Sequence, residues 1–257
     1  MIYRFEEVTS TNDLARDAQF GHGDVLVAER QTAGRGQRGH TWLSVAGQNL
    51  TFTLVVEPQF LPARDQFFLS ACSALALCDC FTHFGIETRI KWTNDIYVED
   101  RKLVGILIEH FYAGANLRKT LIGIGINVNQ TAFDASLPNP TSMQLERGEA
   151  FDREQVLNRF YDCFMARYAQ LEAGHTERLL ADYHRLIYRL GALQRFRLPE
   201  GEEFEATIEG IEQDGALKLL HSSGERHSYH FTEVEFVVKC AKKRVKRVKL
   251  RPIYFLL

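Results

Sequence analysis

The spacing of apolar residues changes several times along the chain, and these changes restrict the fold more than any other feature of the sequence. Residues 24–29 form a short apolar run, and residues 50–57 alternate apolar and polar side chains with the period of a half-buried strand. Between Pro62 and Gly85 the spacing becomes helical, with Phe68, Ala71, Leu75 and Cys78 on one face. The first third of the chain therefore predicts two strands followed by a helix that ends at a glycine.

The middle of the chain predicts hairpins and then two more helices. Short strand-like runs at residues 89–92, 96–98, 103–111 and 119–128 are separated mostly by brief polar turns, which favours antiparallel pairing. Asp152 then begins an amphipathic segment with Val156, Phe160, Phe164 and Leu171 on one face. A further helix is expected from about residue 176 to 189, with Gly191 at its end.

After Gly191 the pattern becomes purely β-like. Short runs at residues 203–211, 216–220, 225–231 and 235–238 are joined by the turns Asp214-Gly215 and Ser223-Gly224, which is typical of a small β-barrel. The order of elements predicts an α+β fold, with a mixed or antiparallel sheet and helices followed by the β module. We therefore expect domains at residues 1–190 and 191–238, followed by a basic tail at 239–257.

Charge and hydropathy exclude several classes of protein. The net charge is -2, but residues 239–251 hold eight of the 31 basic residues and no acidic one, so the rest of the chain is strongly acidic. Such a body is not expected to bind nucleic acid, which requires clustered positive charge. No run approaches the roughly 18 apolar residues of a membrane span, and the start of the chain is not a secretion signal. We expect a soluble, cytoplasmic protein whose tail, which could also pack on the body or touch a membrane surface, is dispensable.

The five cysteines do not suggest a metal site or a disulfide framework. Their number is odd, and no two form a C-x-x-C pair. Cys72 and Cys78 lie among apolar residues, where cysteine behaves as a small hydrophobic side chain. Reduced thiols with a core role are expected.

A glycine-rich segment, residues 31–42, lies between two of the predicted strands. Gly34, Gly36 and Gly39 permit unusual backbone angles and expose N–H groups, while Arg35 and Arg38 add positive charge. Such a loop suits the phosphates of a nucleotide, although a solvated surface loop would have the same composition. It is neither a P-loop nor a dinucleotide fingerprint, because no Gly-Lys-Ser/Thr follows and no G-x-G-x-x-G opens a helix.

This segment and four others resemble, in order, the motifs of biotin–protein ligases. The segments are Ser10-Thr11-Asn12 (S-T-N), residues 34–42 (G-R-G-x-R-G-x-x-W), residues 91–95 (K-W-P-N-D), residues 101–109 (R-K-L-x-G-I-L-x-E) and residues 123–129 (G-I-G-I-N-x-N). Five ordered matches over nearly half the chain are far more specific than any one. The resemblance implies a class II synthetase-like catalytic domain and an SH3-like C-terminal domain.

The resemblance also implies an activity. Members of this family form biotinyl-5′-AMP from biotin and ATP, with Mg²⁺ expected, and transfer biotin to a lysine of a biotin carboxyl carrier protein. The chain begins about ten residues before the S-T-N match, so a DNA-binding domain and transcriptional repression are not expected. A homodimer is compatible with the resemblance.

Biotin presents two N–H donors and a carbonyl acceptor on its ureido ring, so its pocket needs short side chains of both kinds. Ser10, Thr11, Asn12 and Gln31 supply them, although Ser10 and Thr11 could also cap a helix. The resemblance adds the loop residues Arg35, Gly36 and Gln37, together with Lys102, to the biotin site.

Joining a carboxylate to ATP brings anions together, so cations must be in place before the reaction. The candidate catalytic residues are Lys102, Arg35, Arg38 and Asp95, and the resemblance assigns Lys102 to the carboxylate and phosphate of the adenylate. It assigns ATP binding to Arg38, Trp42, Asn94 and Asn127, with Asn94 at the adenine and Asp95 at a metal or the catalytic lysine. Trp92 is expected in the core. The metal ligands are left open.

The sequence departs from the family pattern at two positions. Gln37 replaces an arginine found in some members, and Thr93 replaces the usual proline. Neither change removes an essential charge, but the two departures put retention of the adenylate in doubt. Two alternatives stay open at this point: a lipoate or octanoate ligase of related fold, and a non-catalytic ligand-binding module.

Overall fold

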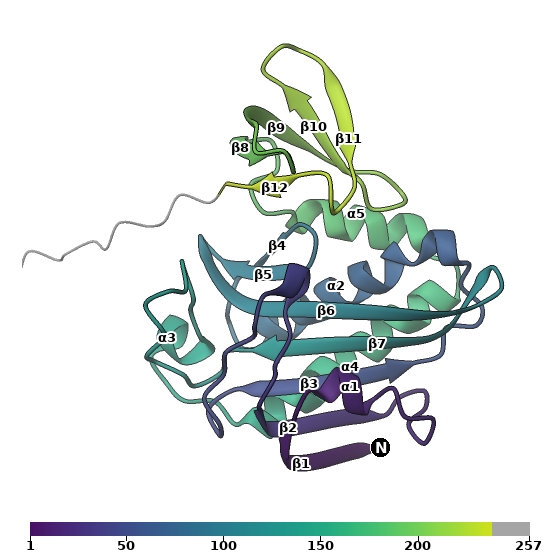
Figure 1. Ribbon diagram of the computed structural model, residues 1–257, viewed down its shortest axis with the longest axis vertical. Coiled ribbons are helices and arrows are strands. Elements are labelled where there is room, and N and C mark those ends of the chain that lie inside the picture. Colours follow the sequence, from purple (N-terminus) through teal and green to yellow (C-terminus); the bar gives the residue numbers. More distant parts are fainter. Residues whose placement is uncertain (238–257) are drawn as a thin grey trace, which may run out of the picture.

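The computed structural model describes residues 1–237, apart from the side chain of Arg38. A seven-stranded mixed sheet forms the centre of the larger domain, with the strand order β1-β2-β3-β7-β6-β5-β4 (Figure 1). Its strands are β1 (Ile2–Val8), β2 (Val25–Gln31), β3 (Leu50–Val56), β4 (Arg89–Lys91), β5 (Asp95–Val98), β6 (Arg101–Ala113) and β7 (Asn116–Ile126). The six strands expected from the sequence are confirmed, whereas the predicted basic tail lies outside the described residues.

Strand β1 is the one strand of this sheet that the apolar pattern does not predict. It lies at the edge of the sheet and pairs in parallel with β2, whereas the other neighbours pair antiparallel. Arg4, Glu6 and Glu7 interrupt its apolar residues. Charged side chains are tolerated on an edge strand because one side of it faces water.

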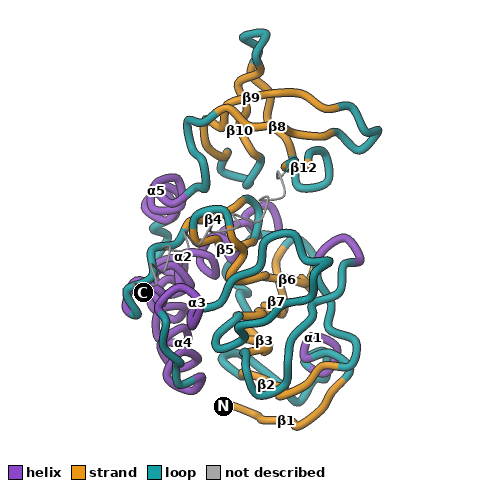
Figure 2. The backbone as a smooth tube through the Cα atoms, turned by 90° about the vertical axis from the view of Figure 1, so that its left-hand side faces the viewer, coloured by secondary structure: helices purple, strands orange, loops and turns teal. Residues whose placement is uncertain are grey.

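Three helices cover one face of the sheet, as Figure 2 shows from the side. They are α2 (Phe67–His83), α4 (Arg153–Glu172) and α5 (Thr176–Leu186). Gly85 follows α2 with φ +69°, as expected for a terminating glycine, and the Asp152 side chain caps α4 by accepting a hydrogen bond from the Glu154 N–H. Helix α5 ends three residues earlier than expected, and a short helix, α3 (Met143–Arg147), was not predicted.

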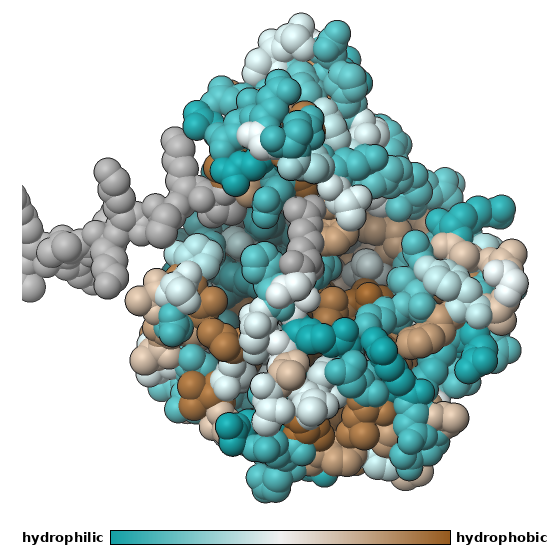
Figure 3. Space-filling view, viewed as in Figure 1, coloured by the Kyte–Doolittle hydropathy of each residue, from teal (hydrophilic) through white to brown (hydrophobic). Residues whose placement is uncertain are grey.

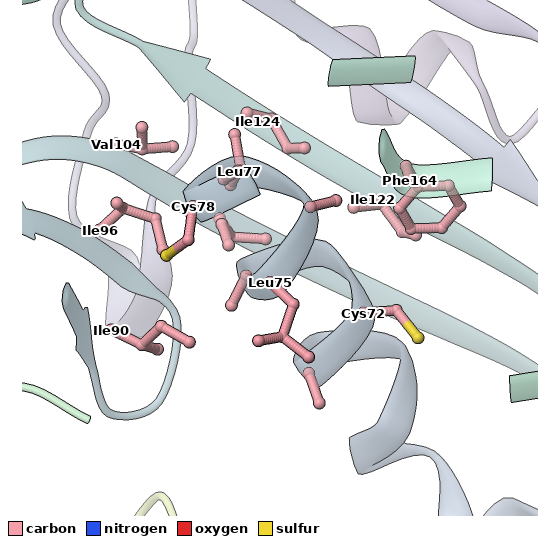
Figure 4. Close-up of a cluster of buried hydrophobic side chains, with 14 of the residues drawn as sticks. Cys72, Leu75, Leu77, Cys78, Ile90, Ile96, Val104, Ile122, Ile124 and Phe164 are labelled. Atoms are coloured by element: carbon pink, nitrogen blue, oxygen red, sulfur yellow. The ribbon is translucent and has the colours of Figure 1, made fainter. Parts of the chain in front are cut away.

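Helix α2 supplies more buried side chains between helices and sheet than either of the other two helices (Figure 4). Leu75, Leu77 and Cys78 point toward Ile90, Ile96, Val104 and Ile124 of the strands. Burial raises the pKa of Cys72 and of Cys78 to about 12, so both stay neutral thiols. The four described cysteines, Cys72, Cys78, Cys80 and Cys163, are free and buried, which confirms the expected core role, and Cys240 lies outside the described residues.

The opposite face of the sheet carries α1 (Thr11–Leu14) and the chain that connects β2 to β3 (Figures 1 and 2). A second, smaller core lies there, where Ala15 and Phe20 pack on Leu26, Val55 and Leu121. The buried Lys119 ammonium donates to the carbonyls of Asp17 and Phe20 and so holds the chain after α1 against the sheet. This face is free of the large helices, so loops can enclose a site on it.

The C-terminal domain is an antiparallel sheet with the order β11-β10-β9-β8-β12. Its strands are β8 (Leu193–Arg197), β9 (Glu203–Ile211), β10 (Leu217–His221), β11 (Arg226–Tyr229) and β12 (Glu235–Phe236). The fold class is as expected, with one difference. Among the described residues the sheet is not closed as a barrel, because β11 and the two-residue β12 each have a single partner strand.

Specific contacts fix this domain on the larger one. The Trp92 indole donates a hydrogen bond of 2.8 Å to the Gly215 carbonyl, and Trp92 is buried, as expected of a core residue. The Gly215 backbone lies so close to Phe67 that a Cβ there would be 2.2 Å from the ring. His184 of α5 lies 3.0 Å from both the N–H and the carbonyl of Ile211. These contacts attach the C-terminal domain to Trp92 and to α2 and α5 of the first domain.

Candidate active site

A cavity of about 500 Å³ opens on the helix-free face of the seven-stranded sheet. This face is hollowed below the C-terminal sheet in the space-filling view (Figure 3). Every site residue predicted from the sequence lines the cavity, except Arg38, whose side chain lies outside the described part of the structure. They are Ser10, Thr11, Asn12, Gln31, Arg35, Gly36, Gln37, Trp42, Asn94, Asp95, Lys102 and Asn127.

Three glycines form the floor of the cavity. Gly105 of β6 pairs with Gly125 of β7. Gly123 lies two residues before Gly125 in β7 and faces the same side of the sheet. A Cβ at Gly125 would be 2.2 Å from the Trp42 indole, and a Cβ at Gly123 would be 2.3 Å from Asn12 Oδ1. Glycine within a strand marks such close approaches. Gly123 and Gly125, which alternate with isoleucines in β7, are therefore the feature of the sequence that could have indicated the floor.

Hydroxyl and amide groups surround the Gly123 end of the floor. The Gln31 Oε1 atom accepts a hydrogen bond from the Thr11 N–H at 2.8 Å and lies 3.2 Å from the Thr11 hydroxyl oxygen. The Asn12 amide nitrogen donates to Glu109 Oε2 at 2.9 Å. Ser10 occupies the N-cap position of α1, but its side chain makes no capping bond. The expected alternative role of Ser10 as a side-chain cap is therefore not what the structure shows.

An ion pair lies at the Gly125 end. Lys102 Nζ is 2.7 Å from Asp95 Oδ1 and 5.9 Å from the centre of the Trp42 ring. Lys91 Nζ is 4.0 Å from the same carboxylate. Asp95 of β5 pairs with Gly105 of β6. This strand pairing explains why Asp95 meets Lys102, which lies seven residues later in the sequence. Asp95 thus contacts the lysine expected to act in catalysis.

Arg35 lies over the Gly123 end rather than beside Lys102. Its guanidinium pairs with Asp13 at 2.8 Å and with Glu109 at 3.1 Å, so its charge is already matched by two carboxylates. Burial raises the pKa of Glu109, but hydrogen bonds from Asn12, Arg16 and Arg35 outweigh burial and hold that pKa below its ordinary value. Arg35 therefore attaches the glycine-rich loop to α1 and β6 in this structure.

Two predicted nucleotide-binding asparagines bond to the main chain. The Asn94 amide nitrogen donates to the Ile106 carbonyl, and the Asn127 amide nitrogen donates to the Thr141 carbonyl at 2.9 Å. Both side chains are buried at the cavity wall. The peptide bond between Trp92 and Thr93 is cis, at the position where the sequence departs from the family's proline.

The sequence did not reveal the far wall of the cavity. It is formed by the segment 133–140 after β7 and by the C-terminal residues Phe231, Val234, Glu235 and Phe236, together with Lys91 and Tyr97. The Lys91 ammonium lies 5.2 Å from the Phe236 ring and 5.4 Å from the Tyr97 ring. No local pattern links these segments: the loop after β7 reaches the site through the fold of the first domain, and the residues of the C-terminal domain reach it only because that domain docks there.

Two kinds of feature are absent from residues 1–237. No group of three or more His, Cys, Asp or Glu side chains there could hold a metal ion. No helix of that part of the chain is long and apolar enough to cross a membrane.

Comparison with known proteins identifies the family. The model of the biotin/lipoate A/B protein ligase family matches residues 3–127. A bifunctional ligase/repressor BirA of Bacillus spizizenii is 32% identical over 240 residues, covering 89% of this chain and 72% of that protein. A biotin–[acetyl-CoA-carboxylase] ligase of Mycobacterium tuberculosis is 31% identical over 218 residues, covering 82% of this chain and 79% of that protein. This chain belongs to the biotin–protein ligase family.

The fold agrees with solved biotin–protein ligases. The enzyme from Aquifex aeolicus, solved in complex with biotin and ATP, superposes with a TM-score of 0.80 over 93% of this chain and 99% of that one, at 24% identity. The likeness covers both the sheet domain and the C-terminal domain. The resemblance inferred from five short motifs is thereby confirmed at the level of family and fold.

Proposed function

We propose that this chain is an ATP-dependent biotin–protein ligase that forms biotinyl-5′-AMP and then transfers biotin to a lysine of a biotin carboxyl carrier protein. One observation supports this most. A single cavity joins a hydroxyl and amide end, at Thr11, Asn12 and Gln31, to a cationic end, at Lys102. Asn12 lies over Gly123, and Trp42 and Lys102 lie over Gly125 and Gly105, so one cavity can take a ureido ring at the first end and a reacting carboxylate at the second.

In the first step, a biotin carboxylate oxygen attacks the α-phosphorus of ATP, the bond to the pyrophosphate oxygen breaks, and pyrophosphate leaves. Negative charge on the carboxylate and α-phosphate must be offset throughout. Lys102 can do this because its ammonium is held at the cavity floor by Asp95. Asp95 thus acts as a positioning residue for the catalytic cation.

In the second step, the uncharged amine of the carrier lysine attacks the acyl carbonyl carbon of biotinyl-AMP. The bond to the phosphate oxygen breaks, AMP leaves, and the amine loses a proton. Trp42 can cover the nucleotide, and the glycine-rich loop with Arg35 and Arg38 can close over the mixed anhydride and exclude water. Gly36 and Gln37 line the same side of the cavity.

Magnesium fits this scheme as a companion of ATP. Mg²⁺ commonly binds substrate phosphates together with one or two carboxylates and several waters. Within the described residues no cluster of three metal-ligating side chains exists, so a dedicated protein cage is not built there. Asp95 is the carboxylate at the cavity floor that could contribute a ligand.

We extend the proposal to the organisation of the protein. Residues 1–190 form the domain that binds biotin and ATP. Residues 191–238 form the C-terminal domain, which supplies part of the cavity wall beside the nucleotide. Asn94 and Asn127 shape that wall through their main-chain bonds. We place the activity in the cytoplasm, without a nucleic-acid or membrane partner. A homodimer stays a prediction.

Transfer of labelled biotin tests the function. The purified chain, ATP and Mg²⁺ should label a biotin carboxyl carrier domain, and a carrier with its acceptor lysine replaced by arginine should stay unlabelled. Pyrophosphate release with biotin, lipoic acid or octanoic acid as the only acid distinguishes the related ligases. Release with lipoic or octanoic acid but not with biotin would contradict the proposal, and binding of biotin without any release would indicate a non-catalytic module.

A further inference from the structure

Thr53 lies behind the cavity wall, in the middle of β3. Its side chain is fully buried and points to the face that carries α1, as do those of Thr51 and Val55, whereas Phe52 and Leu54 point to the opposite face. Thr53 is not among the described residues that line the cavity. A buried hydroxyl is costly unless it is hydrogen-bonded, so the partners of Thr53 decide what this residue does.

The Thr53 hydroxyl contacts two residues of the S-T-N segment. Its oxygen is 2.5 Å from Asn12 Oδ1 and 2.8 Å from Thr11 Oγ1. An amide oxygen can only accept, so the hydroxyl proton of Thr53 goes to Asn12. The Thr53 oxygen keeps lone pairs that can accept a hydrogen bond from the Thr11 hydroxyl.

This bond determines the orientation of the Asn12 amide. With Oδ1 held by Thr53, the nitrogen turns to Glu109 Oε2 at 2.9 Å and to the Leu107 carbonyl at 3.4 Å. Gly123 leaves room for the amide on the sheet, because a Cβ there would be 2.3 Å from Oδ1. The amide is therefore hydrogen-bonded to β3 and β6 and lies over Gly123 of β7, the strand between them.

Thr53 also contacts Thr11, the second residue at the hydroxyl and amide end of the cavity. Thr11 is held by Thr53 on one side, and its N–H occupies the Gln31 amide oxygen at 2.8 Å. That contact leaves the Gln31 amide nitrogen as the end of the side chain that can meet a ligand. A single buried hydroxyl thus bonds to two residues at the cavity wall, Thr11 and Asn12, and the first of these holds the Gln31 amide through its backbone N–H.

We propose that Thr53 is a positioning residue for biotin, which fixes Thr11 and Asn12 from behind the cavity without touching the substrate. The inference rests on the proposed function. Losing the hydroxyl frees both side chains to rotate, so it weakens biotin binding. ATP binding is unaffected, because Lys102 and Trp42 share no described hydrogen bond with this group.

The test compares two threonines on the same face of the same strand. Thr53→Val should raise the KM for biotin about tenfold, while the KM for ATP and kcat at saturating biotin stay within about twofold of wild type. Thr51→Val is the matched control, because the Thr51 hydroxyl is equally buried but donates to the Ala28 carbonyl at 2.9 Å. It should leave both KM values unchanged. Thr53→Ser keeps the hydroxyl and should restore most of the biotin affinity.

Measurements of pyrophosphate release and of melting temperature on all variants separate the outcomes. If Thr53→Val and Thr51→Val lower the melting temperature alike and neither changes the KM for biotin, Thr53 is structural and the inference is wrong. Should Thr53→Val fail to fold, Thr53→Ala provides the same comparison with a smaller side chain, and a normal KM for biotin there also overturns the inference. Absence of biotin-dependent release in the wild-type chain would instead contradict the proposed function.

Discussion

The two ends of the cavity are built in different ways. At the Gly123 end, Thr11 and Asn12 are buried, and both are hydrogen-bonded to Thr53 of the sheet. At the Gly125 end, the Lys102 side chain keeps 33% of its surface exposed in its ion pair with Asp95. A buried hydrogen bond is costly to break because both groups lose their partners, whereas a half-exposed ion pair exchanges partners at little cost. We infer that the first end is preorganised for biotin and that the second rearranges when ATP enters.

The largest expected effect concerns the rearranging end. Lys102→Ala should slow adenylation by about two orders of magnitude or more, because a positioned charge at the transition state contributes roughly 3 kcal/mol or more. Pyrophosphate release measures the rate, and circular dichroism checks the fold. Lys218→Ala, which removes an exposed lysine of the C-terminal sheet paired with Glu212, is the control. Near-normal release by folded Lys102→Ala would mean that Lys102 is not the catalytic cation.

A pair of glycine substitutions tests whether the two ends are separable. Gly123→Ala places a methyl group against Asn12 and should raise the KM for biotin about tenfold, with roughly 1–3 kcal/mol of destabilisation from overpacking. Gly125→Ala places it against Trp42 and should raise mainly the KM for ATP. The melting temperature should fall less in Gly125→Ala, because Trp42 belongs to a loop.

Gly21→Ala controls for the loss of glycine itself, since the nearest atom to its Cβ would be 3.8 Å away. Equal effects of Gly123→Ala and Gly125→Ala on both KM values would show that the cavity behaves as one unit.

The glycine-rich loop connects the two ends, and we predict that residues 34–42 are mobile without ligand and ordered over biotinyl-AMP. Ordering costs roughly 1–2 kcal/mol per residue, which contacts with the adenylate must offset. Arg35→Ala or Gly36→Val should therefore raise the release rate of biotinyl-AMP several-fold and increase biotinylation of unrelated proteins. Biotin binding alone should change less.

Hydrogen exchange across residues 34–42 measures loop closure directly. Protection should rise when biotin and ATP are both present, and equal protection with and without them would mean that the loop does not close. Arg30→Ala is the matched control, because Arg30 forms an exposed ion pair with Glu7 outside the loop.

The smallest effect is expected from removing residues 242–257. The described residues of both cavity ends precede residue 237, so synthesis of biotinyl-AMP should stay within about twofold of the full chain. The truncated chain is assayed for pyrophosphate release, and its melting temperature reports whether the tail packs on the body. Loss of synthesis in a folded truncation would place part of the functional chain in the tail.

The sequence predicted the elements of the catalytic domain well where a local pattern existed. The alternation in β3, the cap at Asp152 and the glycine after α2 each follow from interactions within a few residues. Strand β1 escaped prediction because its charges hide the pattern, and the barrel expected after Gly191 is an open sheet as far as residue 237, where the described part of the chain ends. Closure depends on pairing between distant strands, which short apolar runs do not encode.

By itself the sequence determined the family, the strand and helix order, and most of the residues at the cavity. Those residues lie in short motifs whose chemistry and order are legible one segment at a time. The tertiary structure decided which groups meet. It paired Arg35 with Asp13 and Glu109, placed Thr53 behind Asn12, and brought Phe236 to the wall. The reason is physical: these contacts join segments tens to hundreds of residues apart, and their geometry exists only after the sheet has paired and the second domain has docked.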